Sequence, residues 1–131
     1  MPSRKFFIPG NPAPQGSKRY VGGGRMVESS KKLEEWRAVI AQVAGLRLPP
    51  ITDTPVTVSA TFILHRPQRL GITGDEPMIY KPDLDKLTRA LGDGLVQSNR
   101  LDDDSRIVAW RVAKRYAAWH EPTGCEVEVR W

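Results

Sequence analysis

Aspartates at short spacing are the residues of this 131-residue chain best suited to do chemistry. They lie in two stretches, residues 81–94 (KPDLDKLTRALGDG) and residues 101–108 (LDDDSRIV). Residues 75–104 hold eight of the fifteen acidic side chains against four basic ones, a net charge of −4 within a chain of +5. Clustered carboxylates repel one another unless a proton or a cation neutralises them. One tight acidic cluster in a basic protein is what metal-assisted chemistry on a polyanion requires.

The candidate ligands are Asp83, Asp85 and Asp104, whose hard carboxylate oxygens suit Mg²⁺ or Mn²⁺. An ion held there would bind a phosphate oxygen, stabilise transition-state charge and lower the pKa of an attacking water. Arg89, one helical turn after Asp85, could reach the scissile phosphate or a ligand carboxylate. Spacing alone does not prove that Asp104 meets Asp83, because a helix and a turn separate them. The three form one site only if the fold brings them together.

A purely structural explanation of the same residues stays open. Asp83 suits the N-cap of a helix, and Asp85 suits its first turn, where the helix dipole favours an acid. Residues 102–104 could form an exposed turn, and Asp93 is better explained as an ion-pair partner of Arg89 than as a ligand. On this interpretation no bond is broken at these carboxylates.

Basic residues elsewhere point to an anionic partner, most commonly nucleic acid. Outside the acidic window the net charge is +9. Residues 9–26 combine three prolines and five glycines with three cations and no acid, and a second proline-containing loop covers residues 65–82. Cations and exposed backbone amides in such loops suit a phosphate backbone. The candidate DNA contacts are Lys18, Arg19, Arg25, Arg66, Arg69, Lys81 and Lys86.

Hydrophobic periodicity predicts the elements that position these residues. Apolar spacing of three and four predicts two helices, and alternation in β-branched stretches predicts four strands. The resulting order β-α-β-α-β-β predicts a two-layer α/β (α+β) fold with helices packed on a mixed sheet, as a single domain over residues 1–131. The predicted strands are 5–8, 56–64, 105–120 and 125–131, and the predicted helices are 31–44 and one beginning at residue 83.

Several classes of protein are excluded or disfavoured. Cys125 is the single cysteine, so an intrachain disulfide is impossible and a cytoplasmic location is expected. No apolar run has the length of a membrane span or a signal peptide. No phosphate-binding loop motif occurs, so we expect no nucleotide cofactor. His65 and His120 are too few and too scattered for a zinc site with Cys125.

The aspartate motifs resemble those of the RusA family of Holliday junction resolvases, common in phages and prophages. The resemblance implies a Mg²⁺-dependent endonuclease that acts as a homodimer and nicks opposing strands of a four-way DNA junction, in recombination and repair. It implies Asp83, Asp85 and Asp104 as metal ligands, with Asp103 beside them. The matching segments are PDLDKL at 82–87, DGL at 93–95, DDSRIV at 103–108 and FIPGNP at 7–12.

Two positions depart from the family pattern. Lys86 stands where the family usually has asparagine, and Arg89 stands where it has an important lysine. Arginine keeps the positive charge but does not give up a proton as lysine can. Arg89 is therefore expected to bind phosphate or stabilise the transition state. A DNA-binding module without nuclease activity and a metal enzyme with another anionic substrate are the alternative functions.

Overall fold

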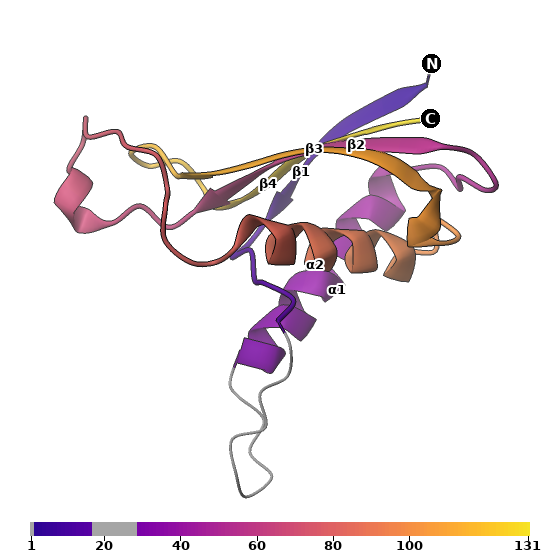
Figure 1. Cartoon of the computed structure of the whole chain (residues 1–131), viewed down its shortest axis with the longest axis horizontal. Coiled ribbons are helices and arrows are strands. Elements are labelled where there is room, and N and C mark those ends of the chain that lie inside the picture. The colour runs from indigo at the N-terminus through magenta and orange to yellow at the C-terminus, as the bar shows by residue number, and fades with distance from the viewer. Residues whose placement is uncertain (1, 17–28) are drawn as a thin grey trace, which may run out of the picture.

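A four-stranded mixed sheet with two helices on one face forms the fold (Figure 1). The computed structural model describes residues 2–16 and 29–131. The strand order is β1-β4-β2-β3, and only β2 and β3 run parallel. The predicted fold class and element order are therefore confirmed. The elements are β1 (Ser3–Pro9), α1 (Ser29–Arg47), β2 (Val56–Leu64), α2 (Leu84–Gln97), β3 (Ile107–Tyr116) and β4 (Gly124–Arg130).

The central strand β2 supplies much of the core. Its alternating residues Val56, Val58, Ala60 and Phe62 are buried, because every second side chain of a strand points to the helix-covered face. Strand β2 has the bounds predicted from its pattern, 56–64. It pairs with β4 on one side and with β3 on the other, so β3 is left as an edge strand.

Helix α1 packs its apolar face on the sheet and on α2. Trp36 and Ile40 on this face are 2% and 0% exposed, as expected for core residues. The helix was predicted to stop at Gly45 but continues to Arg47. Arg100 donates hydrogen bonds from Nε and Nη2 to the Gly45 carbonyl, at 3.1 and 2.9 Å, and so satisfies an acceptor near the helix end.

Helix α2 is held by a buried leucine stripe. Spacing predicts a buried stripe of Leu84, Leu87, Leu91 and Leu95; the last three are almost fully buried, whereas Leu84 is only partly buried. Gly94 lies where α2 approaches α1, and a Cβ built there would lie 2.5 Å from Cγ2 of Ile40. The glycine that weakens the helix in isolation therefore permits the close contact between the two helices.

The β2-α2-β3 unit determines where the aspartates lie. Because β2 and β3 are parallel, the helix between them must run back along the sheet. Figure 1 shows the start of α2 and the turn before β3 at opposite ends of the sheet. Strand β3 is shorter than predicted, since Asp104–Arg106 form a 3₁₀ turn before it and the chain leaves the strand after Tyr116. Within the described ranges, no helix is long and apolar enough to cross a lipid bilayer.

Candidate functional site

Asp83 and Asp85 lie together where the loop after β2 becomes helix α2. Asp83 is the N-cap residue, with an extended backbone, but its carboxylate makes no capping hydrogen bond. Nζ of Lys86 lies 3.5 Å from Oδ2 of that carboxylate. Asp85, in the first turn, is exposed. The capping explanation therefore accounts for the position of Asp83 but not for its side chain, which stays available to a ligand.

Lys114 of β3 fixes the segment that leads into these aspartates. Its Nζ donates hydrogen bonds to the backbone carbonyls of Tyr80, at 2.6 Å, and Pro82, at 2.9 Å. Lys114 pairs in register with buried Phe62, so its side chain projects on the helix-covered face of the sheet. Sequence reasoning missed this role. The available signal was the alternation Trp110, Val112, Lys114, which places a charge on an otherwise apolar face.

Asp104 lies at the other end of the same unit. It begins the 3₁₀ turn before β3, whereas Asp83 follows a segment bound by Lys114 near the end of β3. From Ile107 to Lys114 the strand covers roughly 23 Å at about 3.3 Å per residue. No group of three histidine, cysteine or acidic side chains in the described part of the chain lies close enough to hold a metal ion. Within one chain, the fold does not bring Asp104 to Asp83 and Asp85.

The other acids beside Asp104 have local partners. Asp102 accepts hydrogen bonds from Arg106 Nε, at 3.3 Å, and from the Asp53 backbone N–H, at 3.4 Å. Asp103 accepts a hydrogen bond from the Ser105 hydroxyl, and this bond lowers the pKa of the Asp103 carboxyl. These contacts order the turn on which Asp104 is exposed.

On α2, Arg89 and Asp93 do not pair with each other. Nη1 of Arg37, on α1, lies 3.9 Å from Oδ2 of Asp93, because the packing of the two helices brings that arginine across. The predicted Arg89–Asp93 ion pair is therefore wrong. Arg89 is exposed one turn after Asp85. Its guanidinium thus lies on the same end of α2 as the two carboxylates.

Three of the cations predicted to contact DNA have partners within the chain, namely Lys86, which pairs with Asp83 as described above, Arg66 and Arg69. Arg66 donates to the carbonyls of Gly71, Gly74 and Ala117, at 2.8, 2.5 and 3.2 Å, and so ties the loop after β2 to the end of β3. Arg69 forms an ion pair with Glu76. Their contact with DNA remains a prediction. Lys81 is exposed beside Asp83, while Lys18, Arg19 and Arg25 lie outside the described residues.

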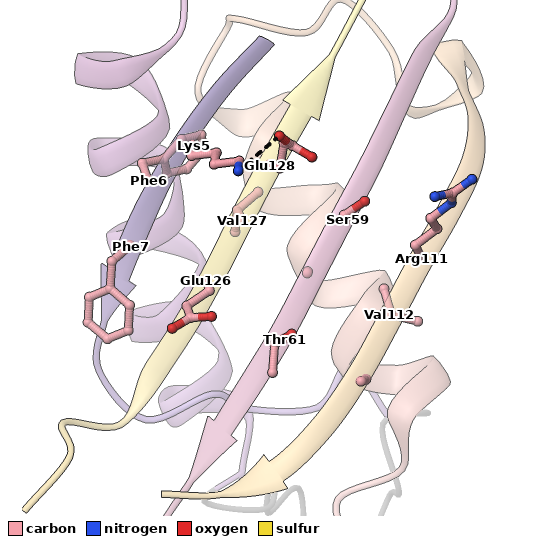
Figure 2. A pocket seen from close by; sticks show the side chains of 12 residues that line it. Lys5, Phe6, Phe7, Ser59, Thr61, Arg111, Val112, Glu126, Val127 and Glu128 are labelled. Carbon is pink, nitrogen blue, oxygen red and sulfur yellow. Dashed lines mark ion pairs between the residues drawn. The ribbon is translucent and has the colours of Figure 1, made fainter. Parts of the chain in front are cut away.

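A shallow hollow of about 760 Å³ lies on the sheet face opposite the helices (Figure 2). Small side chains such as Ser59 and Thr61 form its floor, and Arg111, Glu126 and Glu128 stand around it. Glu128 is paired with Lys5, at 3.8 Å. Two cations and two glutamates line this hollow, so it carries no net positive charge to attract a phosphate backbone, and the aspartates of α2 lie on the other side of the sheet. We therefore do not assign this hollow to the active site.

Comparison with known proteins identifies the family. Residues 9–130 match the family described as "Endodeoxyribonuclease RusA". The chain belongs to the RusA family. It is therefore a Holliday junction endodeoxyribonuclease of DNA recombination and repair, and the interpretation in which no strand is cut does not fit this RusA protein. A search of curated proteins found no match to the chain.

Proposed function

We propose that this RusA protein resolves four-way junctions by paired nicks, with Mg²⁺ or its substitute Mn²⁺ held by Asp83 and Asp85 of one subunit and Asp104 of the partner subunit. The observation that carries the proposal is the exposed carboxylate pair at the start of α2, with Asp104 at the far end of β3. The nuclease domain is taken as residues 1–131, acting in the cytoplasm without a nucleotide cofactor.

The donor set fits a magnesium ion. Mg²⁺ is usually bound through one or two carboxylates together with waters and substrate phosphates. Asp83 and Asp85 supply two such carboxylates, and neither is consumed by a cap. When bound, the ion would supply Lewis-acid stabilisation of the phosphate charge and an activated water. The chain's own part is to orient these carboxylates, which Lys114 does through the backbone before Asp83.

A two-fold pairing of the edge strand would complete the site. In the part of the chain that the structure describes, strand β3 has a neighbouring strand on one side only, and unpaired edges are templates for another strand. Two copies of β3 paired antiparallel place the start of each strand beside the end of the other. Asp104 of the partner subunit would then approach Asp83 and Asp85, because these lie near the end of β3. Both helical layers remain on one face of the joined sheet.

The remaining roles follow from charge. Arg89 would bind the scissile phosphate and stabilise charge in the transition state, as a fixed cation that does not transfer a proton. Lys81 and Lys86 flank the carboxylates and would hold the adjacent strand. Two identical sites in a two-fold pair match the approximate two-fold symmetry of a four-way junction.

Mixing two inactive variants tests this arrangement. Asp83→Asn and Asp104→Asn are each expected to abolish cleavage of a supercoiled plasmid that extrudes a cruciform. In a mixed dimer, one site would combine intact Asp83 and Asp85 with intact Asp104 of the partner subunit, and the other site would lack both groups. The mixture should therefore regain nicking of one strand, giving open circles and little linear plasmid.

The matched control mixes Asp83→Asn with Asp85→Asn. Asp83 and Asp85 of any one site come from the same subunit, so each site of a mixed dimer lacks one of these two carboxylates. No mixed dimer therefore contains an intact site. This mixture should stay inactive. A failure of the first mixture to nick, with exchange of subunits shown by mass spectrometry, would rule out the shared site. Full activity of Asp104→Asn alone would remove Asp104 from the metal site.

A further inference from the structure

A second cleft is lined by the residues that lead into Asp83. It has a volume of about 440 Å³, within the range of roughly 300–1,000 Å³ that is usual for small-molecule sites. It lies between the end of β2, the loop after that strand and the end of β3. Lys81 and Pro82 form one wall, and Asp83 is the next residue. We call it the tyrosine pocket, and its lining includes His65, Arg69, Met78, Tyr80, Lys81 and Tyr116.

Charged hydrogen bonds hold the walls of the tyrosine pocket in place. Lys114 binds the carbonyl of Tyr80, and Arg66 binds carbonyls in the loop and at Ala117. The backbone N–H of Ala117 in turn donates to the Leu64 carbonyl, at 2.7 Å. These contacts join the loop to both parallel strands, so the pocket is built in advance of any ligand.

The chemistry of the tyrosine pocket suits a flat ligand with polar edges. Tyr80 is 61% exposed, and Tyr116 and Met78 are half-buried, so aromatic and thioether surfaces face the cleft. Arg69 is paired with Glu76, so its guanidinium is less available to bind a phosphate. Phenol hydroxyls and the imidazole of His65 supply hydrogen-bonding groups at its rim. Nucleobases combine a stacking face with such edges.

We propose that the tyrosine pocket takes one unstacked nucleobase of the junction, next to the phosphate that is cut. The proposal rests on the placement of the cleavage site at Asp83. Extruding a base costs least where pairing and stacking are already weakened, as at a branch point. The pocket would therefore help this enzyme to distinguish a junction from a linear duplex, and its contacts would favour particular bases near the cut.

Binding measurements with abasic junctions test the proposal. The assay uses wild-type and variant proteins in EDTA with a synthetic four-way junction that lacks one base at a chosen position near the branch. Tyr80→Ala should weaken binding to the intact junction about 5- to 150-fold, the range for loss of one stacked base. It should leave binding to a linear duplex unchanged. Tyr80→Phe keeps the stacking face and should lose much less affinity for the junction than Tyr80→Ala does.

The decisive result is coupling between the protein and DNA changes. At one position in each cleaved strand, removal of the base should weaken binding by the wild type about as much as Tyr80→Ala weakens binding to the intact junction. The same base removal should not weaken binding by Tyr80→Ala any further. The matched control is Ile79→Ala, which truncates a neighbouring side chain that is 77% exposed and does not line the pocket. It should bind as the wild type does.

Two results separate this proposal from that of the metal site. If the affinity losses caused by Tyr80→Ala and by base removal multiply at every abasic position, the base pocket is overturned. If Asp83→Asn and Asp104→Asn nevertheless complement each other, the shared metal site is still supported. Coupled losses together with failed complementation would support the pocket and overturn the shared site. An equal loss of duplex and junction binding in Tyr80→Ala would also overturn the pocket.

Discussion

The ammonium group of Lys114 lies 2.9 Å from the backbone carbonyl oxygen of Pro82, and the residue that follows Pro82 is the metal-ligand candidate Asp83. An edge strand thus holds the backbone that presents a carboxylate of the proposed site. Outer contacts that orient metal ligands commonly affect metal affinity strongly without touching the ion. Lys114 is therefore a positioning residue for the proposed nuclease site.

Replacing Lys114 by methionine should weaken metal binding. The methionine keeps an apolar stem of similar length but donates to neither carbonyl, so the segment before Asp83 loses its anchor. We expect roughly 10-fold weaker Mn²⁺ binding by calorimetry and a matching rise in the Mg²⁺ concentration that half-saturates cleavage. Lys5→Met, on the opposite face of the sheet, is the control. Unchanged Mn²⁺ affinity in Lys114→Met would contradict the positioning role.

Lys86 is expected to oppose metal binding. Its Nζ lies 3.5 Å from the Asp83 carboxylate, and a cation at that distance repels a divalent ion bound there. Both side chains are about half exposed, so the effect should be about 1 kcal/mol or less. Lys86→Asn should therefore bind Mn²⁺ a few-fold more tightly in the absence of DNA. The comparison is Lys81→Asn, which removes a nearby charge without breaking an ion pair to Asp83. Tighter Mn²⁺ binding by Lys81→Asn but not by Lys86→Asn would refute the proposed repulsion between Lys86 and the metal ion.

Two glycines of α2 should respond in opposite ways to alanine. Gly94→Ala places a Cβ 2.5 Å from Cγ2 of Ile40, so α1 and α2 must move apart, at a cost of about 1–3 kcal/mol in the free energy of unfolding. Gly92→Ala places its Cβ 3.5 Å from Cζ2 of Trp110, an ordinary contact. It should be neutral or stabilising by up to about 1 kcal/mol, through helix propensity. Urea unfolding measures both, and equal effects would show that the interhelical contact is looser than described.

The ion pair between Arg115 and Glu121 should make stability depend on pH. The hydrogen bonds from Arg115, and then the one from the Ala118 N–H, lower the pKa of Glu121 from an ordinary value of 4.5 to about 2. A lowered pKa stabilises the folded state fully above about pH 4.5, and this contribution is lost as the pH falls towards 2. The pair is partly exposed, so Glu121→Gln should lower stability by about 1 kcal/mol or less at pH 7.

Thermal unfolding at several pH values measures this effect. The difference in Tm between wild type and Glu121→Gln should be largest at neutral pH and should shrink below pH 4.5. The comparison is Glu126→Gln, which changes another acid at the same end of the sheet that forms no ion pair with a residue in the described part of the chain. A difference for Glu121→Gln that stayed constant down to pH 2 would mean that the carboxylate charge contributes nothing.

Most of the fold could be predicted from the sequence because local pattern and burial agree. Strand β2 alternates apolar side chains with small or polar ones from Val56 to Phe62, and the leucines of α2 recur at helical spacing. The predicted ends of helices and strands were less accurate where a residue distant in the sequence makes a contact. Arg100 satisfies the Gly45 carbonyl across more than fifty positions, and nothing near Gly45 in the sequence indicates it.

The site was predicted only in part for a topological reason. Asp83 and Asp85 are neighbours in sequence, so any helix beginning there presents both. The position of Asp104 depends on the direction of α2 relative to β3, which follows from the parallel pairing of β2 and β3. Sequence patterns identify strands but not their neighbours. Lys114 was missed because its partners are backbone carbonyls, which no residue type reveals.

The length of β3 has a mechanical consequence if two copies join along it. One active site would then lie at each end of the paired strands. The hydrogen-bonded strands between the two sites would fix the distance that separates them. Ten residues at about 3.3 Å each set the interval between incisions at roughly 30 Å. Insertion of two residues into this strand would lengthen that interval by about 7 Å. Such a change would shift where the second nick falls relative to the first while leaving each centre chemically intact.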